Sequence, residues 1–120
     1  MDAPERYLLV ATGGALGALA RYYAYAQFGA ATLTTFAVNI SGTFLLGILM
    51  GSAAGADLRW RLLAGIGFLS GYTTFATLEF EAMLAWRQSG WLLVAANLLG
   101  SVVVGFAAVV AGFAFGERLH

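Results

Sequence analysis

Apolar residues dominate four long stretches of the chain, and charged or turn-forming residues separate them. The stretches cover residues 7–28, 32–50, 62–86 and 91–115. Each is close in length to the roughly 20 residues that an α-helix needs to cross the hydrocarbon of a bilayer. The apolar runs do not alternate as the strands of a membrane barrel do. The pattern predicts an all-α membrane protein, a single transmembrane domain (1–120) of four helices.

Composition narrows the classes of protein that remain. Of the 120 residues, 61% are hydrophobic and 10% are charged, and the mean hydropathy is +0.83. A soluble domain is about 25% charged, so these few charges cannot cover a surface that faces water. Equal numbers of basic and acidic residues argue against a nucleic-acid partner. The absence of cysteine excludes a disulfide scaffold and a thiol enzyme.

The arginines bear on how the chain inserts. An even number of helices puts both termini on one side of the bilayer. That side also receives most of the arginines, namely Arg6, Arg59, Arg61 and Arg118, against Arg87 and at most Arg21 on the other. By the positive-inside rule, such an excess favours placing that side in the cytoplasm. A difference of about two charges is only a small bias. Insertion in one orientation and insertion in both therefore stay open.

Glycines recur at a spacing typical of close helix packing. The chain has 16 glycines and one proline, and four glycine pairs are separated by four positions: Gly13 and Gly17, Gly47 and Gly51, Gly67 and Gly71, Gly112 and Gly116. Small residues let helix backbones approach each other in lipid. Four tightly packed helices enclose no aqueous path, so a transporter of this size is expected to be an oligomer. We expect a homodimer with sites at or near the subunit contacts.

Two of the stretches carry small polar residues on one helical face. Thr35, Asn39 and Thr43 are spaced by four residues, and so are Asn97 and Ser101. Hydroxyl and amide groups donate hydrogen bonds, and neither series contains a carboxylate. Such a surface suits an anion better than a metal cation. Hydrogen bonding between helices is the structural alternative.

The third stretch contains Ser70-Gly71 followed closely by Thr73-Thr74, which predicts a broken helix in mid-span. Non-helical backbone at that depth must be satisfied by protein, ion or water. Freed carbonyls can bind a small cation, and a new helix starting near Phe75 can direct N–H groups toward an anion. The ring edge of Phe75 is electropositive. A tolerated kink is the alternative interpretation.

Three charged residues lie inside the predicted spans. Arg21 either extends to the interface or sets a positive potential at a pore mouth, and we favour the pore mouth. Glu79 and Glu81 are two residues apart and point to roughly opposite faces of their helix. They do not form a paired-carboxylate site, and each is expected near a wet vestibule or an arginine.

Three segments together resemble the Fluc (CrcB) family of small bacterial fluoride channels. Residues 13–22, GGALGALARY, resemble the family's GGxxGAxxRY, and residues 38–47, VNISGTFLLG, resemble VNxxGxFxxG. Residues 67–78, GFLSGYTTFATL, are similar to GFxGGxTTFSTF. The segments follow the family's order on three of the four helices, so the resemblance spans essentially the whole chain.

The resemblance implies an antiparallel, dual-topology homodimer in the bacterial inner membrane, with two fluoride pores and a central structural Na⁺. Fluoride would leave the cytoplasm passively, with no enzymatic step. The polar series and the resemblance together assign the pore to Asn39, Thr43, Phe75, Thr77, Asn97 and Ser101. The resemblance assigns Arg21 and Glu81 to the pore mouth, and the backbone carbonyls of Ser70 and Thr73 to Na⁺.

Three positions depart from the family pattern. Leu78 replaces the second pore phenylalanine, Ala76 replaces a serine, and Ser70 replaces a glycine. The first two leave open a reduced fluoride flux or a heterodimer whose partner carries the missing groups. A four-helix multidrug exporter is one rival, but it needs a carboxylate inside the first span, where this chain has none. A non-transporting packing subunit is the other.

Overall fold

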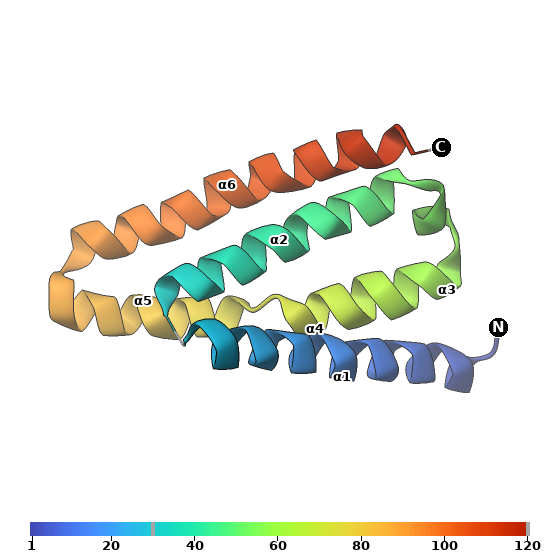
Figure 1. Cartoon of the computed structure of the whole chain (residues 1–120), viewed down its shortest axis with the longest axis horizontal. Helices are drawn as coiled ribbons and strands as arrows, with labels where there is room; N and C mark the ends of the chain where they lie inside the picture. Colours follow the sequence, from blue (N-terminus) through green and yellow to red (C-terminus); the bar gives the residue numbers. More distant parts are fainter. Residues whose placement is uncertain (30, 120) are drawn as a thin grey trace.

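The computed structural model describes residues 1–29 and 31–119. Every regular element in this part of the chain is a helix, with no strand. Four long segments run back and forth, so that both ends of the chain lie at the same end of the molecule (Figure 1). The third segment is divided. The elements are α1 (Ala3–Phe28), α2 (Thr32–Gly51), η1 (Ala53–Ala56), α3 (Leu58–Trp60), η2 (Arg61–Leu69), α4 (Ser70–Tyr72), α5 (Phe75–Ser89) and α6 (Trp91–Glu117).

Local chemistry explains where the helices begin and turn. α1 starts at Ala3 rather than residue 7, because the Asp2 side chain caps the helix by accepting the Glu5 N–H at 3.0 Å. Two turns depend on glycine. Gly29, after α1, has φ 88°, and Gly90, between α5 and α6, has φ 86°, a left-handed region that glycine enters without strain.

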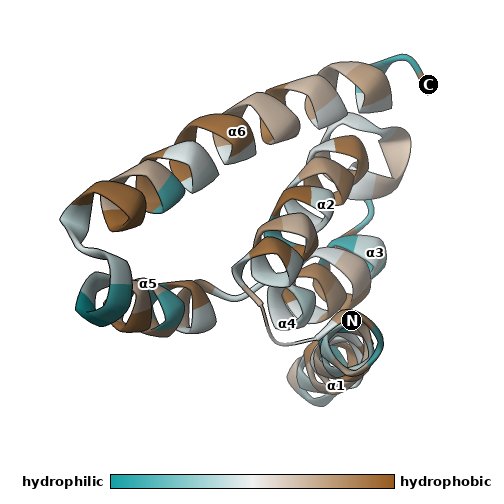
Figure 2. Cartoon of the chain, turned by 60° about the vertical axis from the view of Figure 1, so that its left-hand side comes forward, coloured by the Kyte–Doolittle hydropathy of each residue, from teal (hydrophilic) through white to brown (hydrophobic). Residues whose placement is uncertain are grey.

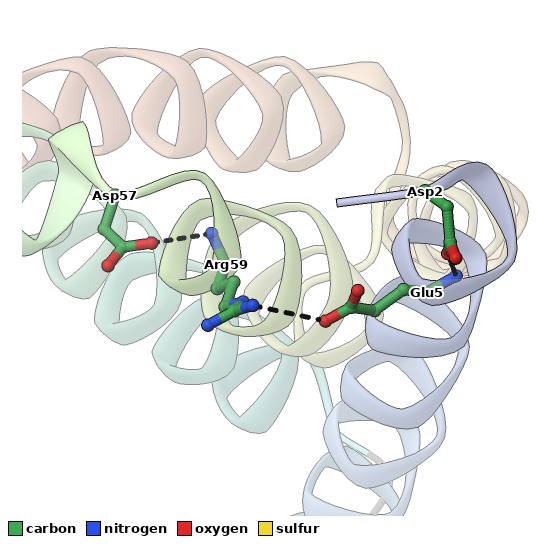
Figure 3. Close-up of polar contacts among 4 residues, drawn as sticks. All are labelled: Asp2, Glu5, Asp57 and Arg59. Carbon is green, nitrogen blue, oxygen red and sulfur yellow. Dashed lines mark hydrogen bonds and ion pairs between the residues drawn. The ribbon is translucent and has the colours of Figure 1, made fainter.

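Polar contacts gather where α1 and α3 begin (Figure 3). Asp57 caps α3 by accepting the Arg59 N–H at 2.9 Å. The Arg59 guanidinium also lies 3.5 Å from the Glu5 carboxylate, and both side chains are exposed. The ion pair therefore joins the first turns of two helices at the surface, where such pairs contribute under about 1 kcal/mol.

Glycines bring α1 against the third segment. A methyl group added at Gly13 would collide with the carbonyl oxygen of Leu63, and one added at Gly17 would collide with that of Phe68. In return, a methyl group on Gly71 would lie 2.6 Å from the carbonyl oxygen of Gly14. Each backbone thus lies directly on the other, as the glycine spacing predicts.

The same arrangement joins α2 to α6. A methyl group on Gly47 would lie 2.5 Å from the carbonyl oxygen of Val109 and 2.8 Å from the amide nitrogen of Phe113. Gly112 meets the backbone of α2 in the same way, at the carbonyl of Phe44. The two glycine-lined contacts therefore pair α1 with the third segment and α2 with α6.

Large apolar side chains face outward on most of the molecule. The buried core is small, and its larger members are Val38, Leu69, Leu78 and Val94. Hydrophobic residues run along α2 and α6, whereas hydrophilic residues concentrate on α5 and near helix ends (Figure 2). Among the described residues, α2 and α6 are long and apolar enough to cross a membrane, and only 6% of the apolar window of α6 is buried. A soluble protein buries such a helix, so this surface is suited to lipid.

Candidate functional site

The third segment is interrupted between Tyr72 and Phe75. Thr73 (φ −81°, ψ 157°) and Thr74 (φ −149°, ψ 121°) are extended, and α5 begins immediately afterwards. The structure therefore confirms the predicted break and the predicted start of a new helix at Phe75. The strand-like pair is short, but it removes the helical hydrogen-bond partners of several backbone groups at once.

Asn39, on α2, pairs with the backbone of the break. Its Nδ2 donates to the Thr74 carbonyl at 3.0 Å, and the Thr74 N–H donates to Asn39 Oδ1 at 2.8 Å. The side chain amide thus gives the Thr74 N–H the acceptor that a continuous helix would supply, and it adds a second donor to the Thr74 carbonyl. The sequence predicts Asn39 as a pore donor, with hydrogen bonding between helices as the alternative, but it does not identify Thr74 as the partner. One N–H of the amide is left for a further acceptor.

The start of α5 is capped by the break itself. The Thr74 hydroxyl oxygen accepts the Thr77 N–H at 3.2 Å, and the Thr74 and Thr77 hydroxyls are 3.2 Å apart. Phe75 and Ala76 occupy the first positions of α5, where N–H groups have no partner within the helix. The positive end of the helix dipole coincides with these N–H groups. This end of α5 can accept a negative charge.

The break frees two particular carbonyls. In a continuous helix, the Ser70 carbonyl would accept from the Thr74 N–H and the Thr73 carbonyl from the Thr77 N–H. Those two N–H groups donate instead to Asn39 Oδ1 and to the Thr74 hydroxyl. The redirected amides leave free the carbonyls that the resemblance assigns to Na⁺, and unwound carbonyls are suitable Na⁺ ligands. The residues present therefore fit the ion.

The side chains near these carbonyls are turned toward their own helix. The Thr73 hydroxyl donates to the Leu69 carbonyl at 3.0 Å, and the Ser70 hydroxyl donates to the Gly65 carbonyl at 3.3 Å. Within residues 1–29 and 31–119, no group of three or more His, Cys, Asp or Glu side chains could hold a metal. A cation at this position would be held by backbone oxygens.

Arg21 reaches the other side of the break. Its Nε donates to the Gly71 carbonyl at 3.1 Å, in a partly buried position near the end of α4. The predicted pore-mouth arginine thus bonds to the backbone just before the extended residues.

The remaining predicted pore residues are distributed over α2, α5 and α6. The Thr43 hydroxyl donates to the Asn39 carbonyl at 2.6 Å within α2, so its proton is already used. The Ser101 hydroxyl and one carboxylate oxygen of Glu81 are buried without a hydrogen-bond partner among the described residues. No hydrogen bond of the Asn97 side chain is found in that part of the chain. The break thus joins Asn39 to Thr77 through Thr74, and the α6 donors stay unpaired.

Phe75 and Leu78 lie in opposite environments. The Phe75 side chain is 73% exposed, whereas Leu78 is 6% exposed and belongs to the core. A single chain therefore offers the Phe75 ring on its outer surface. A cavity of about 550 Å³ lies beside the break, and Tyr72 and Ser41 are among its lining residues. None of the predicted pore residues lines it.

Comparisons with known proteins identify relatives over nearly the whole chain. The family model described as CrcB-like protein, Camphor Resistance (CrcB), matches residues 8–113. A curated protein of Solibacter usitatus, named fluoride-specific ion channel FluC, is 40% identical over 94% of this chain and 99% of its own length. The proteins with this name in Acidobacterium capsulatum (42%, covering 95% and 98%) and Koribacter versatilis (37%, covering 90% and 92%) are similar. These relatives are named as channels and not as enzymes. The chain belongs to the CrcB-like protein family.

Proposed function

We propose that this chain forms a fluoride-selective channel through which fluoride leaves the bacterial cytoplasm passively, across the inner membrane. The observation that carries the proposal is the break at Thr73 and Thr74, where side chains hold non-helical backbone in place amid apolar helices. Backbone of this kind is tolerated at membrane depth only where it is buried or lines a wet cavity. The names of the curated relatives support fluoride as the ion.

Fluoride is small and strongly hydrated, so its path must supply hydrogen-bond donors in place of water. Near the break, the second N–H of Asn39, the Thr77 hydroxyl and the free N–H groups at the start of α5 are such donors. The Phe75 ring edge adds a weakly positive surface. Asn97 and Ser101 continue the series on α6, which packs against both α2 and α5. A bore lined by these groups would be too narrow for larger halides.

A second copy of the chain completes the pore. In one chain, Phe75 lies on the outer surface and the donors near it have no opposite wall. An antiparallel partner supplies that wall, and its symmetry creates two equivalent pores. The small excess of arginines at the end that carries the termini is compatible with insertion in both orientations. The alternative is a heterodimer with a related chain. Channel activity of this chain purified alone would exclude that alternative.

The carbonyls of Ser70 and Thr73 are the groups that would hold a structural Na⁺ between the two copies. The ion would supply a fixed positive charge that offsets the dipoles of the carbonyls that hold it. Asn39 and the Thr74 hydroxyl keep those carbonyls free by taking the amides that would otherwise pair with them. Replacing Na⁺ by a large organic cation should weaken the dimer, and no effect would contradict this site.

Ion release from liposomes tests the proposal. Purified protein in vesicles loaded with equal fluoride and chloride should release fluoride and retain chloride when a gradient is applied. Phe75→Ile should abolish the release, because the aliphatic chain has no electropositive edge. Phe115→Ile, a half-exposed ring at the far end of α6, is the matched control and should leave the release unchanged. Equal release of both halides, or release of neither, would refute the channel.

A further inference from the structure

Arg21 acts on a single atom of the broken segment. Its Nε donates to the Gly71 carbonyl at 3.1 Å, and the bond is partly buried. Gly71 is the next-to-last residue of α4, so its carbonyl is one of those that a helix end leaves without an internal partner. The negative end of the helix dipole is at the same place. A cationic donor satisfies both the hydrogen bond and the charge.

The packing of α1 fixes Arg21 in this position. Residues 13, 17, 21 and 25 recur every four positions along one side of α1. A methyl group on Gly17 would lie 2.9 Å from the Tyr72 amide nitrogen, so α1 lies directly on the end of α4. One turn beyond Arg21, the Tyr25 hydroxyl is hydrogen-bonded to the buried Thr35 at 2.8 Å, which ties α1 to α2. The arginine therefore extends from a backbone held on both sides.

The bonded carbonyl lies between the two freed ones in the chain. Gly71 follows Ser70 directly, and Thr73 is two residues further on. Fixing the Gly71 peptide restricts the direction of its neighbours, because each peptide unit is planar and only two dihedral angles separate it from the next unit. Asn39 holds the break from the α5 side at Thr74, and Arg21 holds it from the α4 side.

We propose that Arg21 is a positioning residue. It caps α4 through the Gly71 carbonyl and so sets the direction of the Ser70 and Thr73 carbonyls, and it does not act as a charge that attracts anions to a pore mouth. The transport part of this inference rests on the proposed function, whereas the cap itself does not. The two roles make different demands on the side chain, since a cap needs a donor at the Nε position and an attracting charge does not.

Three substitutions separate these demands. Arg21→Gln places its Nε2 the same number of bonds from the backbone as the arginine Nε, without a charge. Arg21→Lys keeps the charge but moves the nitrogen one bond further, and Arg21→Met removes both. We expect fluoride efflux from Arg21→Gln within about threefold of the unchanged protein, and a loss of about tenfold or more for Arg21→Met, the scale of a hydrogen bond to a charged group. Arg21→Lys should fall below Arg21→Gln.

Two further measurements do not depend on transport. Hydrogen exchange of the peptide covering residues 68–76, measured in detergent, should be unchanged in Arg21→Gln and faster in Arg21→Met. The Na⁺ concentration that gives half of the thermal stabilisation should stay the same in Arg21→Gln and rise about tenfold in Arg21→Met, a shift that a loss of packing alone would not produce.

The order of the variants in efflux and in hydrogen exchange tests the proposal. If Arg21→Gln matches Arg21→Met in efflux and exchange while Arg21→Lys matches the unchanged protein, the arginine acts through its charge and the proposal is overturned. If the unchanged protein releases no fluoride, the proposed function fails, and the exchange experiment still decides whether Arg21 caps α4.

Discussion

Replacing Asn39 by alanine should destabilise the chain more than removing the Thr43 hydroxyl on the same helix. The substitution removes both hydrogen bonds to Thr74, of 3.0 and 2.8 Å. Thr74 is the N-cap of α5, so its carbonyl keeps the first hydrogen bond within the helix, and only its N–H loses its partner. Leaving a partly buried N–H without a partner costs about 1–3 kcal/mol.

Measurements on membrane proteins suggest a smaller destabilisation. Hydrogen bonds between their helices contribute about 0.6 kcal/mol on average, because the separated groups find other partners. Thr74 has no such choice, since it and Thr73 are both extended and rewinding the helix would require both residues to change conformation. We therefore expect the free energy of unfolding to fall by about 1–3 kcal/mol.

Reversible unfolding in mixed detergent micelles, followed by circular dichroism, measures the effect. Thr43→Val is the matched control on the same helix, because its hydroxyl bonds only to the Asn39 carbonyl within α2. It should cost under about 1 kcal/mol. If Asn39→Ala were no more destabilising than Thr43→Val, the pairing with Thr74 would not hold the break, and the argument for the freed carbonyls would fail with it.

Three further substitutions test other contacts by the same measurement. Gly17→Ala should destabilise by more than about 2 kcal/mol because its methyl group meets backbone, whereas Gly100→Ala, with no atom within 4 Å, should cost nothing; equal effects would contradict the close packing of α1. Tyr25→Phe should lower the free energy of unfolding by about 1 kcal/mol, because it leaves the buried Thr35 hydroxyl without this partner. No change would mean that the packing of α1 on α2 does not depend on this bond. Arg59→Ala should change stability by under about 1 kcal/mol, because its ion pair with Glu5 is exposed. A larger loss would contradict a solvent-exposed ion pair.

Sequence reasoning located the break because its signals are local. Ser70-Gly71 followed by Thr73-Thr74 weakens a helix through backbone entropy and through competition from side chain hydroxyls, and both effects act within a few residues. The glycine contacts could be predicted for the same reason, since a spacing of four residues defines one face of a helix. Local rules of this kind supplied the helical class, the end that carries both termini, and the new helix at Phe75.

The partners of the break could not be found in this way. Asn39 and Thr74 are 35 positions apart, and Arg21 and Gly71 are 50 apart. Which of several polar side chains meets a given carbonyl depends on how two helices are shifted along each other. The periodicity of one helix does not contain that shift. The same limit explains why the sequence offers hydrogen bonding between helices as one role for Asn39 but does not identify Thr74 as its partner.

The reciprocal glycine contacts have a consequence for how this sequence can vary. In most protein cores, a larger side chain can be accommodated when a neighbour becomes smaller. Here Gly67 lies against Gly13, and Gly112 faces the backbone of α2. Glycine is already the smallest residue, so no second substitution on the opposite helix can restore the lost space. We therefore expect related chains to vary on their outer surfaces, whereas compensatory substitutions cannot preserve these glycine contacts.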